Sequence, residues 1–386
     1  MDFSLTEEQE MFRRMMRDFV SKEIAPVAAQ YDETEEFPLD NVRKMAKLGL
    51  MGLTIPEDYG GSGGDTLQIA IATEEIARAC AATSVILGVT LGLCNLTIYH
   101  AGNEEQRKRF VVPLSKGTKL GAFGLTEPTA GSDAASLQTM ATRRGDGYVL
   151  NGTKAFISNG KEADIVVVFA TLDRSKGYRG ITAFVVEKGT PGYSVGKKER
   201  KLGIRASSTT ELIFEDCHVP EANRLGQEGE GFKIALKTLD HSRITIAAQA
   251  LGIAQAALDA SVAYAQGRKQ FDKPIASFQA IQWMIADMAT NIDAARLLTY
   301  RAADMADRNI PFSKESAMCK VFAAEVAMAA ATKAIQIHGG YGYIKDYPVE
   351  RYFRDAKITE IYEGTSEVQR LVIARSILGR EYVKGG

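Results

Sequence analysis

The stretch Ile165-Val-Val-Val-Phe-Ala-Thr171 is the clearest strand signal in the chain, and a second such run, Ile181-Thr-Ala-Phe-Val-Val-Glu187, follows it. Both runs are rich in β-branched and aromatic residues, which favour strands. Glu211–Phe214 continues the pattern, and Gly145-Asp146-Gly147 gives a turn signal. Residues 120–225 are therefore predicted to form an antiparallel sheet or barrel.

Helical patterns lie on both sides of this region. Before it, Thr6–Gln9 and Asn103–Gln106 are typical helix starts. After it, long 3.6-residue periodicity covers three Ala-rich stretches, which are Ile244–Ala265, Gln279–Asp307 and Ser313–His338. The sequence thus predicts a multidomain α+β chain, with an N-terminal helical domain (1–119), a central β-barrel-like domain (120–225) and a C-terminal domain resembling a four-helix bundle (226–386).

Composition excludes several classes of function. The 386 residues are 45% hydrophobic and 25% charged, with a net charge of −1, so no global field favours nucleic acid. The sequence has no clustered Cys/His motif for a metal site. The acidic N-terminus has no apolar secretory segment, which indicates a cytoplasmic protein. The uncharged stretch Ala79–Tyr99 favours a buried helix, or a pair of helices, over a membrane span.

Two glycine-rich segments resemble catalytic or nucleotide-binding motifs, but neither has the sequence context that such a motif needs. Gly192–Gly196 matches the G-x-S-x-G pattern of hydrolases, but the charged run Lys197–Lys201 follows it where an apolar helix is needed. A surface turn is the favoured interpretation. The glycines of Gly60–Gly64 form neither a dinucleotide fingerprint nor a Walker A loop, and a flexible connection between helices is expected there.

Three other segments carry more chemistry. Phe123–Asp133 leads apolar residues into hydroxyls, small residues and an acid, and it suits either a ligand loop or a simple strand end. In Lys154–Gly160, Phe156 could cover a planar ring, although a core aromatic is favoured by the residues alone. In Ile361–Glu367, Glu363 stands at a helix break. Its carboxylate either projects into a pocket or stays exposed beside a helix N-cap at Thr365 or Ser366.

Taken together, these segments resemble the acyl-CoA dehydrogenase family, and most closely its bacterial short-chain, butyryl-CoA-type branch. The resemblance extends over residues 3–379. Its most specific motifs occur in the family's order, and they are Gly124–Asp133, Gly152–Gly160, Arg268–Phe271, Gln336–Gly342 and Arg354–Glu367. The family fold of helical domain, β domain and helical bundle agrees with the pattern above.

The resemblance implies a tightly held FAD shared between subunits of a homotetramer. Phe156 stands where most relatives have Trp. Arg268 suits the pyrophosphate, because a guanidinium binds phosphate oxygens well. The residues assigned to the cofactor are Phe123, Leu125, Thr126, Ser132, Phe156 and Ser158 from the β domain, with Arg268, Gln270, Phe271, Phe278, Gln279, Gln336, Gly339, Gly340 and Thr365 from the rest of the chain.

The same resemblance implies that Glu363 is the catalytic base. It would remove the weakly acidic α-proton of the thioester while a β-hydride leaves for flavin N5, and bound substrate would expel water and raise its pKa. The backbone N–H of the base and a ribityl hydroxyl of FAD would polarise the thioester oxygen. Acyl-CoA contacts are expected at Ser132, Asp240, Arg243, Tyr362 and Gly364.

Two positions depart from the short-chain branch, which usually has glycines where His241 and Ser242 stand. They could admit a branched or alicyclic acyl group, although a surface or cap histidine is the favoured interpretation of His241. Some relatives carry the base at the position of Ser242, so a serine there strengthens the assignment to Glu363.

The absence of a nicotinamide motif makes an electron-transferring flavoprotein the implied electron acceptor. Two alternatives stay open, namely an acyl-CoA oxidase-like enzyme that uses oxygen and an enoyl-CoA reductase that runs in reverse. The intact Glu363 and flavin-facing segments argue against a third, a non-catalytic acyl-CoA-binding protein.

Overall fold

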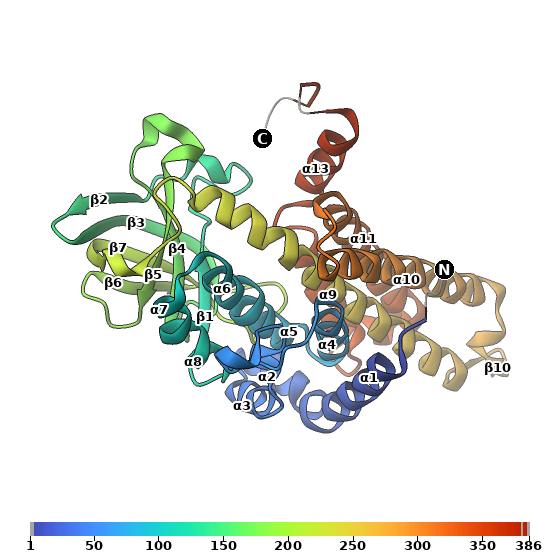
Figure 1. Cartoon of the computed structure of the whole chain (residues 1–386). Helices are drawn as coiled ribbons and strands as arrows, with labels where there is room; N and C mark the ends of the chain where they lie inside the picture. Colours follow the sequence, from blue (N-terminus) through green and yellow to red (C-terminus); the bar gives the residue numbers. More distant parts are fainter. Residues whose placement is uncertain (1–3, 380, 384–386) are drawn as a thin grey trace.

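A computed structural model describes residues 4–379 and 381–383 of the chain. Residues 1–3, 380 and 384–386, which include the ends of the first and last predicted domains, lie outside the described residues. The β-sheet forms one side of the molecule and the long C-terminal helices form the other (Figure 1). The N-terminal helices pack between and beneath them.

The N-terminal part is helical, as predicted. Both expected helix starts form complete capping boxes, Thr6 with Gln9 and Asn103 with Gln106. The uncharged stretch is a buried run of helix, with a π-helical segment at Gly88–Asn95. The α-helices are α1 Glu7–Phe19, α2 Ala28–Thr34, α3 Leu39–Lys47, α4 Thr66–Ala79, α5 Ala81–Leu87, α6 Leu96–Ala101, α7 Glu104–Gln106 and α8 Val112–Ser115.

The central part is a sheet with strand order β6-β7-β3-β2-β4-β5-β8, and β1 also pairs with β4. It is mixed rather than purely antiparallel, because β1 and β2 both run parallel to β4. The long connection between β1 and β4 makes such a parallel pairing possible. The strands are β1 Gly121–Gly124, β2 Met140–Arg144, β3 Gly147–Ser158, β4 Ile165–Thr171, β5 Ile181–Glu187, β6 Tyr193–Lys198, β7 Thr209–Pro220 and β8 Arg224–Leu225.

The predicted surface turn at Gly192–Gly196 is wrong, since Tyr193–Lys198 form the edge strand β6. The stacked pair Tyr193 and Phe214, with ring centroids 5.3 Å apart, holds β6 against β7. The lysines that argued against a hydrolase motif lie at the exposed end of this edge strand, where charge discourages pairing with another chain.

The C-terminal part consists of long helices, and two of them have the predicted bounds. α9 is longer than predicted, and it packs against α4, α10 and α11 and also reaches β5. It therefore connects all three parts of the fold. The elements are α9 Gly231–Gly267, β9 Lys269–Gln270, β10 Lys273–Pro274, α10 Gln279–Asp307, α11 Ser313–His338, α12 Val349–Thr359 and α13 Ser366–Leu378.

Within the described residues, two helical stretches are long and apolar enough to cross a membrane. They are Ala81–Ala101 and Gly231–Gly267, and 89% and 67% of their most apolar windows are buried inside the protein. The expectation of a buried helical stretch at Ala79–Tyr99 is therefore confirmed.

Candidate active site

Glu363 lies in the short turn between α12 and α13. Its backbone is left-handed, with φ of +54°, and Gly364 follows with φ of +97°. The Gln369 side chain donates hydrogen bonds to the carbonyls of both residues, at 3.2 and 2.9 Å. A non-glycine residue rarely adopts positive φ, so these contacts hold a strained turn in place.

The structure combines the two interpretations of Ile361–Glu367, since the segment provides both a helix N-cap and a buried carboxylate. Thr365 is the N-cap of α13, and its hydroxyl accepts a hydrogen bond from the Val368 N–H. The Glu363 carboxylate is not exposed, because its Oε2 atom is buried and has no hydrogen-bond partner. An unpartnered buried oxygen is costly, and such an atom is a candidate for contact with a substrate.

The electrostatics of Glu363 suit a general base. Burial raises its pKa to about 7, while the nearby Ser242 hydroxyl, Lys320 and Arg243 act in the opposite direction. Arg243 is buried on α9 and pairs with Asp240 at 2.8 Å. Of the residues predicted to contact acyl-CoA, the structure therefore brings Asp240 and Arg243 toward the turn that holds Tyr362, Glu363 and Gly364.

Sequence reasoning missed three polar residues that support this turn, which are Gln249, Lys320 and Gln369. The Tyr362 hydroxyl donates to the Gln249 side-chain oxygen, and the Gln249 amide donates to the Ala81 carbonyl at 3.0 Å. Gln249 and Lys320 could have been noticed as polar residues inside long apolar helical runs. Nothing in the sequence indicated that these residues contact the turn that carries Glu363.

The residues predicted to bind the cofactor from the β domain, here called the β-domain group, include the loop after β1, which is held by a buried ion pair. Lys154 on β3 contacts Glu127 at 2.7 Å, and it also donates to the Leu125 carbonyl at 3.2 Å. The Ala155 N–H donates to the Thr126 carbonyl at 2.9 Å. These bonds fix the loop after β1 against β3. The ring of Phe123, on β1, is buried 4.9 Å from that of Phe169.

Phe156 is not a core aromatic, so that interpretation is wrong. Its side chain is 66% exposed, and its φ is +57°. A bulky exposed aromatic in a left-handed conformation is costly without a ligand to cover it. The other residues predicted to line the flavin on this side, Thr126 and Ser158, are half-buried. Ser132 lies on the exposed loop beyond.

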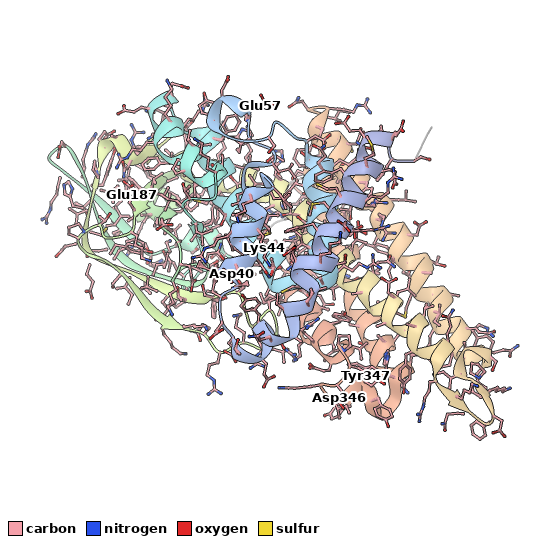
Figure 2. The ribbon with its side chains drawn as sticks, turned by 90° about the horizontal axis from the view of Figure 1, so that it is seen from below. Asp40, Lys44, Glu57, Glu187, Asp346 and Tyr347 are labelled. Atoms are coloured by element: carbon pink, nitrogen blue, oxygen red, sulfur yellow. The ribbon has the colours of Figure 1, made fainter. Side chains whose placement is uncertain are left out.

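The remaining predicted cofactor residues form a separate group at the far end of the helical bundle. Arg268 stacks over the Tyr341 ring at 5.5 Å, and Phe271 is 87% exposed beside Phe278. In Figures 1 and 2 this end, marked by β10 and by Tyr347, lies away from the sheet. One chain does not bring this group to the β-domain group. The group comprises Arg268, Gln270, Phe271, Phe278, Gln279, Gln336, Gly339 and Gly340.

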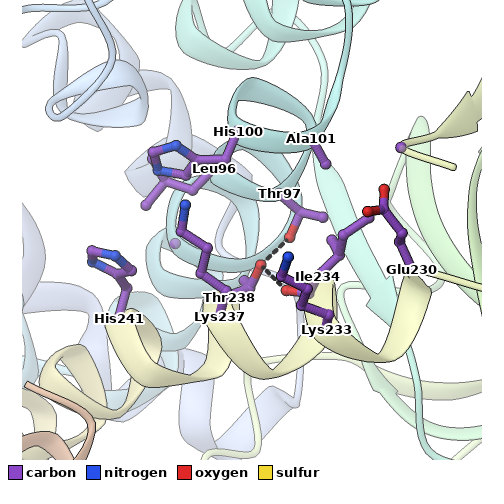
Figure 3. A pocket seen from close by; sticks show the side chains of 12 residues that line it. Leu96, Thr97, His100, Ala101, Glu230, Lys233, Ile234, Lys237, Thr238 and His241 are labelled. Carbon is purple, nitrogen blue, oxygen red and sulfur yellow. Dashed lines mark hydrogen bonds between the residues drawn. The ribbon is translucent and has the colours of Figure 1, made fainter. Parts of the chain in front are cut away.

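His241 lines a cavity of about 240 Å³ between α6 and the first turns of α9 (Figure 3). Its ring stacks on His100 at 6.1 Å and lies edge-on to Phe312 at 4.8 Å. A Thr97–Thr238 hydrogen bond of 2.9 Å connects the two walls. His241 is therefore not a cap, since it lies inside α9 and is half-buried.

Comparison with known proteins gives matches along the whole chain. Three family models match, namely the acyl-CoA dehydrogenase N-terminal domain at residues 6–118, the middle domain at 122–217 and the C-terminal domain at 229–378. A short-chain specific acyl-CoA dehydrogenase of Clostridium acetobutylicum is 55% identical, covering 98% of this chain and 100% of that protein. An acryloyl-CoA reductase (NADH) of Anaerotignum propionicum is 54% identical, covering 98% and 97%.

A solved chain from work on the electron transferring flavoprotein of Acidaminococcus fermentans superposes with a TM-score of 0.97. It is 52% identical and covers 98% of this chain and 100% of that one. With all three domains matched in order over the fold described above, the chain belongs to the acyl-CoA dehydrogenase family of flavin-dependent oxidoreductases.

Proposed function

We propose that this protein catalyses the α,β-dehydrogenation of a short-chain acyl-CoA to the trans-2-enoyl-CoA, with Glu363 as the base. The similarity to a short-chain specific dehydrogenase supports the substrate class. The observation that carries the role of Glu363 is its carboxylate, which has a buried, unpartnered oxygen in a strained turn.

The chemistry requires a base of this kind. The α-proton of a thioester is weakly acidic, and a general base works best when its pKa lies near the working pH. Burial raises the pKa of Glu363 to about 7, which meets that condition. A closed site that excludes water would further strengthen its interaction with the substrate.

FAD, when bound, supplies the acceptor for the hydride that leaves the β-carbon. Phe156, Thr126 and Ser158 would hold it from the β domain of one subunit. Arg268, Gln270 and Phe271 would reach it from a neighbouring subunit, since these exposed residues lie far from the sheet of their own chain. The proposed assembly is a homotetramer in the cytoplasm, and an electron-transferring flavoprotein is the proposed electron acceptor.

The test is the visible spectrum of the flavin-loaded protein before and after anaerobic addition of butyryl-CoA. Bleaching of the flavin bands with formation of crotonyl-CoA is expected. A flavin that stays oxidised with butyryl-CoA but bleaches with a branched or alicyclic thioester would change the substrate. A flavin that bleaches with none of these thioesters would contradict the proposed function.

The reverse reaction is a second candidate, because a relative of 54% identity is an acryloyl-CoA reductase. The same active site would then protonate the α-carbon from Glu363. Anaerobic addition of crotonyl-CoA to dithionite-reduced protein distinguishes the two directions. In a reductase, crotonyl-CoA reoxidises the reduced flavin faster than butyryl-CoA reduces the oxidised flavin.

A further inference from the structure

A buried lysine lies behind the turn that carries Glu363. Lys320, on α11, has no exposed surface, and its ammonium donates a 2.7 Å hydrogen bond to the Gly364 carbonyl. A buried ammonium is destabilising unless charge and hydrogen bonds compensate it. One carbonyl does not neutralise its charge, so the position calls for a nearby anion.

The charged groups around this turn come from three elements. From α9, Arg243 is paired with Asp240 at 2.8 Å. From the end of α12, Glu360 is paired with Lys357 at 2.5 Å, and Glu367 on α13 is exposed. The Glu363 carboxylate is the anion that acts most strongly on Lys320. Its other close neighbours are the Ser242 hydroxyl, Arg243 and the Tyr362 phenol.

We propose that Lys320 is a positioning residue for Glu363. Its ammonium holds the Gly364 carbonyl, and with it the strained turn, while its positive charge stabilises the ionised carboxylate. The catalytic consequence rests on the proposed function, whereas the electrostatic effect on Glu363 does not.

The effect has a definite sign. Burial pushes the Glu363 pKa up, and the Ser242 hydroxyl, followed by the charges of Lys320 and Arg243, pulls it back toward its ordinary value. Burial lowers the pKa of Lys320 to about 8, so the ammonium is still largely protonated at neutral pH. A nearby opposite charge lowers the pKa of a carboxyl group by about 1–3 units, and Arg243 stays in place when Lys320 is lost, so removing the Lys320 charge should raise the Glu363 pKa by about one unit.

Two substitutions separate the charge from the hydrogen bond. Lys320→Gln removes the charge but keeps an N–H donor for Gly364, whereas Lys320→Met removes both. Lys333→Met is the matched control, because Lys333 is on the same helix and pairs with Asp287 at 2.9 Å, away from the turn. Flavin spectra and melting curves identify any variant that fails to fold. If Lys320→Met does not fold, Lys320→Gln alone still tests the effect of the charge.

The readout is an infrared titration of the Glu363 carboxyl band in the flavin-loaded protein, assigned by its loss in Glu363→Gln. Both Lys320 variants should raise the Glu363 pKa by at least about one unit, while Lys333→Met leaves it unchanged. Flavin reduction by butyryl-CoA at pH 7 should fall at least about fivefold and recover at higher pH.

An unchanged Glu363 pKa in folded Lys320→Gln overturns the proposal. The infrared measurement needs no turnover, so it tests Lys320 even if butyryl-CoA is not a substrate. Conversely, normal reduction of the wild-type flavin with an unmoved Glu363 pKa in the variants would leave the proposed function standing and remove the role of Lys320.

Discussion

Glu363 shows how one residue's environment sets its chemistry. Its ionised form is the proposed base, and burial raises its pKa to about 7. We therefore predict that the second-order rate constant for flavin reduction, measured well below saturating substrate, rises about tenfold per pH unit below pH 7 and levels off above it. Stopped-flow measurements from pH 5.5 to 9 test this. A rate that is flat from pH 5.5 upward would contradict a base with a raised pKa.

The sequence predicted the role of a residue only where that residue belonged to a recognisable motif. The segment Ile361–Glu367 indicated an N-cap at Thr365 or Ser366, and the family resemblance indicated Glu363 as the base. The pKa of Glu363 depends on Ser242, Arg243 and Lys320, which lie far from it in sequence. The residues alone favoured a core aromatic at Phe156, whereas the resemblance placed it at the cofactor, and no local signal predicted its exposed side chain and left-handed backbone.

At the scale of elements, the close contact of α4 with α9 depends on a glycine. A Cβ on Gly252 would lie 2.2 Å from the Glu74 carbonyl oxygen and 2.8 Å from the Ala77 methyl. Gly252→Ala should lower the free energy of unfolding by about 1–3 kcal/mol, despite the better helix propensity of alanine. Denaturant melts measure this.

Gly88→Ala is the matched control, since nothing lies within 4 Å of the added carbon. It should be neutral or stabilising by up to about 1 kcal/mol. Equal effects of the two substitutions would mean that the helices separate easily at Gly252.

Periodicity predicted the long helices well. α10 and α11 begin and end where the pattern placed them, while α9 begins earlier than predicted, at Gly231. The sheet was harder to predict, because strand pairing depends on contacts distant in sequence. The parallel pairing of β1 with β4 and the edge strand β6 follow from such contacts, which local patterns do not encode.

In the whole molecule, the proposed cofactor site is completed by a second chain. Glu363→Gln and Arg268→Glu should each be inactive alone. In hybrids, a subunit with intact Glu363 can borrow intact Arg268 from its neighbour, so co-expression should restore activity. Arg308→Glu is the control, because Arg308 is an exposed arginine paired with Asp304 at 3.3 Å. Hybrids without activity would argue against a shared site.

The assignment of Glu363 as the base is tested by comparing Glu363→Gln with Glu367→Gln in anaerobic flavin reduction by butyryl-CoA. Glu367 lies in the first turn of the next helix and is exposed. If Glu363 is the base, Glu363→Gln slows reduction by about 10²–10⁴-fold with FAD retained, while Glu367→Gln stays near wild type. Reduction by Glu363→Gln at the wild-type rate would contradict the assignment of the base.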